Sequence, residues 1–255
     1  MRALQLDLLQ LLPPELVGDA SDRSRGIRIS LRPGAGTAGW TTVPEHPEDE
    51  LRDLEYVVVD LETTGGSAYR GHRITEFAAV RMRATGEVVD EFSTLVNPLR
   101  RIPPIITALT RITPAMVADA PRFPEIVPRV RRILEGAVFV AHNATFDHGF
   151  LSAELAQLGL PLPGRTLCTV RLARRTVPEL SSRSLDSLAY FFNIDNEARH
   201  RAWGDARATA VLLRRLLERL EDHEVRCWHE LEKFLRRRPR RKRKRIANPH
   251  SMEVA

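Results

Sequence analysis

Apolar and polar residues alternate most clearly from residue 54 onward, where the pattern predicts three consecutive strands. The segments are EYVVVDL at 55–61, RITEFAAVRMRA at 73–84 and EVVDEFSTLV at 87–96. Their connections are short, and the second contains a turn at Thr85-Gly86. The three segments therefore predict an antiparallel meander.

Helical spacing dominates the second half of the chain. Apolar residues recur every three or four positions in the segments 124–136, 145–159, 184–192 and 206–225. A last helix that continues through WHELEKFL at 228–235 is an alternative to one that ends at 225. A short buried strand, AVFVA at 137–141, follows the first helix, and the proline-rich segment 97–117 predicts short helical turns. Strands that then alternate with helices predict an α/β fold, with a mixed sheet covered by helices on both faces.

Differences in pattern divide the chain into three parts. Residues 1–50 have weak periodicity, so we expect a loosely ordered N-terminal extension, whereas residues 51–222 hold the α/β pattern. Residues 223–255 are expected to form a helical extension and a basic C-terminal tail. That tail contains RRRPRRKRKR at 236–245, although the formal charge of the whole chain is only +6, so the rest is slightly acidic. Such a run binds polyanions such as DNA, and a merely solubilising segment is the alternative.

Composition argues against several classes of protein. No apolar run approaches the roughly 18–20 residues that cross a bilayer. The leucine-rich start is interrupted by Asp7 and by Pro13-Pro14, so we do not interpret it as a secretory signal. Cys168 and Cys227 are far apart, which favours a reducing compartment over a disulfide framework. We therefore expect a cytoplasmic protein without a membrane segment.

Two carboxylates end the first predicted strand. Successive side chains of a strand point to opposite faces, so Asp60 and Glu62 share one face while Leu61 points to the core. Two anionic groups there repel each other and are costly to remove from water, and a cation held between them is the usual compensation. The alternative is an acidic strand end that only leads into the Thr-Thr-Gly-Gly turn.

Three further polar residues extend this pattern. Asp147 and Asp205 each lie near the start of a predicted helix, where a capping role is the alternative. His200 precedes Asp205 by five residues, which on a helix would separate them by about 140°. A joint role therefore requires His200 to lie on the preceding loop, and a lone surface histidine is the alternative. Four carboxylates without clustered Cys or His favour Mg²⁺ or Mn²⁺, and suit two ions about 3.5–4 Å apart.

The order and spacing of these residues resemble the DEDDh-type 3′–5′ exonucleases, the family that includes the proofreading epsilon subunit of bacterial DNA polymerase III. The matching motifs are Asp-x-Glu-Thr-Thr-Gly at 60–65, His-Asn-Ala-x-Phe-Asp at 142–147 and His-x4-Asp at 200–205. The resemblance covers about residues 54–220. It implies a ribonuclease H-like fold, with a mixed five-stranded sheet flanked by helices. It also implies hydrolysis at DNA 3′ ends with two Mg²⁺ (or Mn²⁺), in proofreading or DNA repair.

The resemblance assigns a role to each catalytic position. It implies that Asp60, Glu62 and Asp205 ligate the ion that activates water, and that Asp60 also bridges to the second ion. By the same resemblance Asp147 supports that second ion. His200 would take the proton from the attacking water, a task suited to a side chain that titrates near neutral pH.

Three more residues are candidate contacts to the 3′-terminal nucleotide, again by resemblance: Thr63, Thr110 and Phe146. A core position suits Phe146 equally well. Many relatives carry Leu-Thr-Gly-Ile-Thr where this chain has LTRIT at 109–113. Arg111 therefore departs from the family pattern, either as a phosphate contact or as a solvent-facing residue.

A motif near the start of the chain suggests a protein partner, and two rival functions fit the same fold. QLDLL at 5–9 resembles the short peptide with which bacterial proteins bind the sliding clamp, and an ordinary amphipathic turn is the alternative. A polymerase or clamp partner is thus one interpretation. An RNA-trimming 3′–5′ exoribonuclease of the same fold and a non-catalytic nucleic-acid-binding subunit are the rival functions. The five intact acidic and histidine positions argue against the binding subunit.

Overall fold

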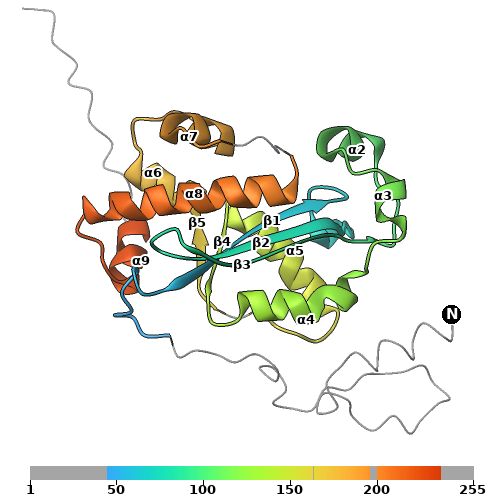
Figure 1. Ribbon diagram of the computed structural model, residues 1–255, viewed down its shortest axis with the longest axis horizontal. Coiled ribbons are helices and arrows are strands. Elements are labelled where there is room, and N and C mark those ends of the chain that lie inside the picture. Colours follow the sequence, from blue (N-terminus) through green and yellow to red (C-terminus); the bar gives the residue numbers. More distant parts are fainter. Residues whose placement is uncertain (1–44, 163, 196–199, 237–255) are drawn as a thin grey trace, which may run out of the picture.

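The computed structural model describes residues 45–162, 164–195 and 200–236 (Figure 1). Residues 1–44, with the clamp-like peptide at 5–9, lie outside these ranges, as does the basic tail after Arg236. No helix within the described ranges is both long and apolar enough to cross a membrane.

A mixed sheet forms the centre of the molecule, and its strand order is β3-β2-β1-β4-β5. The first three strands pair antiparallel, whereas β4 and β5 run parallel to β1. The predicted five-stranded mixed sheet is therefore confirmed. The strands are β1 (Glu55–Thr63), β2 (Ile74–Arg83), β3 (Val88–Leu95), β4 (Val138–Ala141) and β5 (Thr166–Cys168).

Helices cover both faces of this sheet, as the pattern predicts (Figure 1). Two of them pack against one face, α4 (Phe123–Leu134) and α5 (Ala144–Ala156). Four helices lie on the other face, namely α6 (Thr169–Thr176), α7 (Leu185–Phe192), α8 (Ala202–Glu221) and α9 (Trp228–Arg236). The proline-rich segment forms two short helices beyond the sheet, α2 (Pro104–Thr110) and α3 (Pro114–Ala118), and a 3-10 turn, η3 (Ala68–Arg70), lies between β1 and β2.

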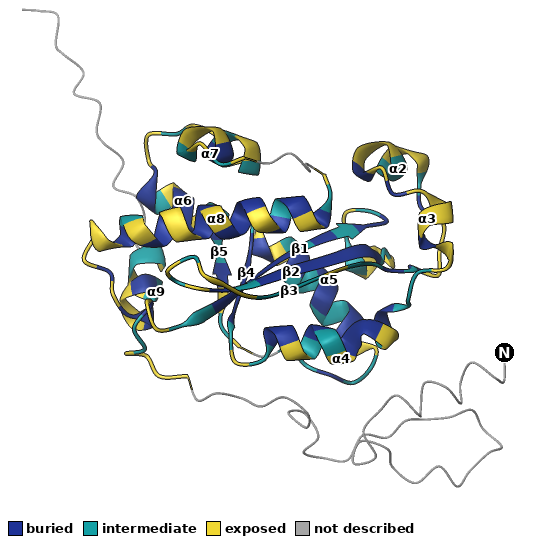
Figure 2. Ribbon diagram, viewed as in Figure 1, coloured by how far each residue is buried: buried dark blue, intermediate teal, exposed yellow. Residues whose placement is uncertain are grey.

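Strand β1 is buried on both faces and separates two apolar clusters. Tyr56 and Val58 belong to the cluster beneath α8, whereas Val57 and Val59 belong to the cluster with α4 and α5. Figure 2 shows the resulting dark core along the central strands. Because side chains alternate along a strand, the residues after Val58 on the α8 side are Asp60 and Glu62.

The last two helices are separate, so α8 does not continue into the segment 228–235. After α8 ends at Glu221, Glu224 has a positive φ of 55°, which ends the helical path. The chain then turns, and α9 packs against α6. Residues 45–50, the described part of the predicted extension, lie against the start of α9, where the amide of Trp228 donates to the carbonyl of Asp49 at 3.0 Å. The division of the chain at residues 50 and 222 stays a prediction.

Candidate active site

Three of the predicted carboxylates meet at one end of the sheet. Asp60 and Glu62 come from the end of β1, and Asp205 comes from the first turn of α8. Each offers one oxygen, and these oxygens all lie within 4.8 Å of one another. The α8 face of β1 therefore changes from apolar to acidic at the point where α8 begins.

Asp147 lies beside this group and is tied to it through the backbone. It stands in the first turn of α5 and is only 4% exposed. Its Oδ1 accepts a hydrogen bond of 3.1 Å from the amide of Leu61, the residue between Asp60 and Glu62. The carboxylate thus fixes the end of β1 against α5.

Burial is the first cause of raised pKa values at Asp60, Glu62 and Asp147. Burial raises the pKa of Asp60 well above its ordinary value, and the charges of Asp147 and Asp205 raise it further. Burial followed by the charge of Glu76 raises the pKa of Glu62 to about 7. For Asp147 burial raises the pKa to about 8, against the opposing effect of hydrogen bonds from backbone amides.

These residues fit a divalent cation. Their donor atoms are carboxylate oxygens alone, the type that Mg²⁺ and Mn²⁺ prefer. Burial, followed by the charges of neighbouring carboxylates, raises the pKa of Asp60 and of Glu62, and a cation beside them would stabilise their charged forms.

His200 lies on the loop before α8, as a joint role with Asp205 requires. Helix α8 begins two residues later, at Ala202, and His200 is exposed. Its backbone is in the left-handed region, with a φ of 58°, and its amide donates to Oδ2 of Asp205 at 3.1 Å. The main chain of the histidine is thereby held against one of the three clustered carboxylates.

The three predicted substrate contacts lie in different surroundings. The hydroxyl of Thr63 donates to the carbonyl of Gly65 at 2.7 Å and so orders the turn after β1. The hydroxyl of Thr110 is buried within its own helix end, where it donates to the carbonyl of Ile106 at 3.0 Å. Phe146 is half-buried against Phe150, with ring centroids 4.9 Å apart. Their contact with a nucleotide stays a prediction.

Arg111 stands at the end of α2, in a backbone conformation that explains the glycine of the family pattern but not the arginine of this chain. Its φ is 61°, and its amide donates to the carbonyl of Thr107. Glycine is favoured in this left-handed conformation because it has no Cβ, so the relatives' glycine suits the same helix end. Arg111 is exposed.

Sequence reasoning missed residues that surround the cluster. Glu76 on β2 is buried and pairs with Arg201. In the sequence, only its position as a single acid within the apolar strand ITEFAAV indicates a special role. His142 opens the motif His-Asn-Ala-x-Phe-Asp, in which only Phe146 and Asp147 have a predicted role. Its ring nitrogens lie 2.8 Å from the hydroxyl of Thr169 and 3.0 Å from the carbonyl of Arg183, which joins the end of β4 to α6 and to the loop before α7.

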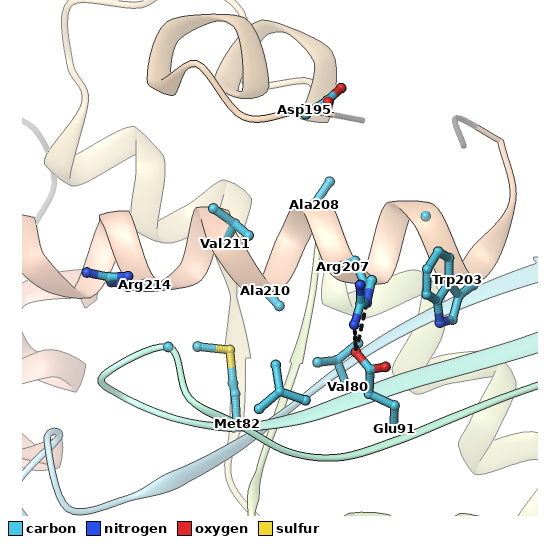
Figure 3. Close-up of a pocket in the computed structure, with 13 residues that line it drawn as sticks. Val80, Met82, Glu91, Asp195, Trp203, Arg207, Ala208, Ala210, Val211 and Arg214 are labelled. Atoms are coloured by element: carbon cyan, nitrogen blue, oxygen red, sulfur yellow. Dashed lines mark hydrogen bonds and ion pairs between the residues drawn. The ribbon is translucent and has the colours of Figure 1, made fainter. Parts of the chain in front are cut away.

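A hollow of about 510 Å³ lies elsewhere, between α8 and the β2–β3 hairpin (Figure 3). Its lining includes Val80, Met82 and Trp203, and one wall carries an ion pair of 2.8 Å between Arg207 and Glu91. None of the predicted site residues lines this hollow. Its apolar lining and paired charges differ from the acidic cluster, so it is not the candidate catalytic centre.

Known proteins resemble the chain over the region that holds this site. A family model described as Exonuclease (RNase T) matches residues 57–213. A DNA polymerase III subunit epsilon-like protein from Rhodobacter capsulatus is 42% identical over 192 residues, 73% of this chain and 26% of that protein. The 3′-5′ exonuclease DinG of Bacillus subtilis is 37% identical over 171 residues, 67% of this chain and 18% of that protein. The chain thus spans less than a third of the length of these curated relatives.

A solved structure gives the same result for the fold. Exonuclease X, in complex with 5′ overhanging duplex DNA, superimposes with a TM-score of 0.53 at 33% sequence identity. The match covers 64% of this chain and 91% of that protein. The ribonuclease H-like sheet expected from the motifs is therefore shared with this neighbour.

Proposed function

Because the chain belongs to the RNase T family of exonucleases, we propose that it is a metal-dependent 3′–5′ exonuclease acting on DNA. The observation that carries the proposal is the convergence of Asp60, Glu62 and Asp205 within 4.8 Å, beside His200. A binding module has no need of acidic groups concentrated at such a cost in repulsion.

Asp60, Glu62 and Asp205 would hold the cation, with Asp147 supporting a second one. Two bound Mg²⁺ or Mn²⁺ ions supply positive charge that stabilises the attacking and leaving oxygens of a phosphodiester displacement. Asp147 keeps the end of β1 in place through the amide of Leu61. His200 accepts the proton of the attacking water, and its exposure leaves the ring open to solvent and substrate.

DNA is the proposed substrate because two matches above 30% identity are named for DNA, whereas a neighbour named for an mRNA stem-loop is only 20% identical and is informative for the fold alone. One is a DNA polymerase III epsilon-like protein, and Exonuclease X was solved with duplex DNA. Proofreading or repair would be the setting. The basic segment 236–245 would add sequence-independent attraction for the DNA backbone. A polymerase or sliding clamp remains the proposed protein partner.

The test uses 5′-labelled oligonucleotides: a single-stranded DNA, its RNA copy and a duplex with a 3′ mismatch. Each is incubated with Mg²⁺ or Mn²⁺ and with wild-type protein, Asp60→Asn or Glu87→Gln. Glu87 is an exposed acid paired with Arg83 next to the β2–β3 turn, so its variant controls for loss of a carboxylate outside the cluster.

We expect a DNA ladder that shortens from the 3′ end with wild type and Glu87→Gln, and none with Asp60→Asn or with chelator. Faster shortening of RNA than of DNA would replace the proposed substrate. Retained nucleic-acid binding without cleavage of any substrate would instead indicate the binding subunit.

A further inference from the structure

A buried acid on β2 lies next to the carboxylate cluster without belonging to it. Glu76 is 3% exposed and pairs directly opposite Glu62 in the β1–β2 register. It follows that both side chains point to the α8 face. The clustered oxygens come from Asp60, Glu62 and Asp205, so Glu76 is a fourth carboxylate at this end of the face with a different set of partners.

Both oxygens of Glu76 accept hydrogen bonds from the start of α8. Nη2 of Arg201 donates to Oε1 at 2.7 Å, and Nε of Arg201 donates to Oε2 at 3.0 Å. The amide of Ala202 also donates to Oε2, at 3.1 Å. This is a bidentate arginine–carboxylate pair with an added backbone bond, the geometry in which such pairs are strongest.

The backbone bond replaces a helix cap. The first amides of an α-helix have no partner within the helix, and Arg201, the residue at the N-cap position of α8, makes no side-chain cap. Glu76 supplies the missing acceptor from a different element of the fold. The start of α8 is therefore anchored to the sheet at Ala202, which is fully buried.

The two residues that the reaction needs from this region lie on either side of the anchor. His200 precedes Arg201 directly, and Asp205 lies in the first turn after Ala202. The hydrogen bond from the His200 amide to Asp205 closes a second link across the same short segment. If Arg201 and Ala202 shift, His200 and Asp205 must shift with them.

We propose that Glu76 and Arg201 are positioning residues that hold His200 and Asp205 in register with Asp60 and Glu62. The inference rests on the proposed exonuclease function. Displacement of a reacting group by about 1 Å costs on the order of 10²-fold in rate. A buried carboxylate without its donors is also costly, so the pair breaks only with rearrangement of the segment.

The experiment compares Glu76→Gln, Arg201→Lys and the double variant with wild type. Glutamine keeps the shape of Glu76 but loses its charge, and lysine keeps the charge of Arg201 but loses the bidentate fork. Arg129→Lys is the matched control, because Arg129 makes a bidentate pair with Asp90, at 2.5 and 2.8 Å, between α4 and β3. All variants are assayed on single-stranded DNA well below their melting temperatures, with circular dichroism confirming the fold.

We expect each single variant to lower kcat by about 10–100-fold with little change in KM, and Arg129→Lys to leave kcat near wild type. The double variant should be no worse than the worse single one, because both remove one interaction. In a His200→Ala background, Glu76→Gln should cost less than it does in wild type, because only the placement of Asp205 then remains to be lost. A wild-type kcat for folded Glu76→Gln, or additive effects with His200→Ala, would overturn the proposal.

A readout that needs no activity separates this inference from the proposed function. Hydrogen exchange of the amides at 200–205 should be slow in wild type and clearly faster in Glu76→Gln, with unchanged exchange in β2 and β3. Wild-type protein that does not cleave DNA would refute the proposed function alone. Unchanged exchange at 200–205 would refute the positioning role whether or not the enzyme is active.

Discussion

The two faces of β1 are built from one strand but differ at its end. On the side of α4 and α5, Val57, Val59 and Leu61 all belong to the apolar cluster. On the side of α8, the apolar residues Tyr56 and Val58 are followed by Asp60 and Glu62. The first face contributes apolar residues to the core from Val57 to Leu61, whereas the second changes from apolar to acidic after Val58.

The difference shows how a sheet can hold repelling charges without losing its shape. Every second residue of β1 stays in the core opposite the acids, so the backbone of the strand is fixed independently of the cluster. The bond from the Leu61 amide to Asp147 is a further support from the apolar side. We therefore expect stability and catalysis to separate according to the face that is altered.

The largest separation should come from neighbouring residues on opposite faces. Asp60→Asn should lower the exonuclease rate by about 10³-fold or more, with unfolding free energy at pH 8 unchanged or higher, because a buried repelling charge is lost. Val59→Ala should lower the free energy of unfolding by about 1.5–3 kcal/mol, with kcat of the folded protein near wild type. Urea unfolding and single-stranded DNA cleavage measure both quantities. A marked loss of stability in Asp60→Asn would contradict the expectation that the two faces of β1 serve stability and catalysis separately.

A second effect should appear in the pH dependence of stability. Folding raises the pKa of Glu62 to about 7 and that of Asp147 to about 8, so the metal-free folded protein binds protons more tightly than the unfolded chain. Their contribution to stability is complete below the ordinary carboxyl values, near pH 4, and is lost as the pH rises to about 8. The melting temperature without metal should therefore fall between pH 5 and pH 8.

Mg²⁺ should reverse this loss, and more so at pH 8 than at pH 5.5, because the ion binds the deprotonated carboxylates of the folded state. Thermal unfolding with and without Mg²⁺ at the two pH values measures the difference. Asp60→Asn is the control, in which the Mg²⁺ effect at pH 8 should be largely lost. Equal Mg²⁺ effects at both pH values would place the binding outside this cluster.

The smallest effect should come from Thr63, the last residue of β1. Thr63→Val removes the hydroxyl bond to the Gly65 carbonyl and should cost about 1 kcal/mol in unfolding free energy. If the hydroxyl also contacts the terminal nucleotide, KM should rise a few-fold, while Thr63→Ser stays near wild type in both measurements. A loss of stability with an unchanged KM would assign Thr63 to the turn alone.

Much of this architecture was predictable because long periodic segments carry strong signals. Strand alternation alone placed Asp60 and Glu62 on one face, and helical spacing located α5 and α8. The pattern missed β5, which at three residues is too short to show a period. It also left open a continuous last helix, because nothing in its apolar spacing marks the turn at Glu224.

The site was predictable only in part, for a different reason. The roles of Asp147 and Asp205 were predictable only from the order of the three motifs, because the proximity of these residues to the end of β1 depends on tertiary packing. The pairing of Glu76 with Arg201 joins residues 125 positions apart and requires the strand register and the start of α8 together. A local pattern does not encode such a contact, so it first becomes visible in the folded chain.

The long separation between the parts of the site also has a consequence during synthesis. Leu61 and Asp147 are 86 positions apart, and Glu76 meets Arg201 only after 125 residues. A ribosome makes the β1 acids first and Asp205 only 145 positions later, so the emerging chain carries an incomplete acidic cluster until the start of α8 has been made. If the proposed function is correct, hydrolysis requires that α8 has been made and docked, and the growing polypeptide does not attack nucleic acid before then.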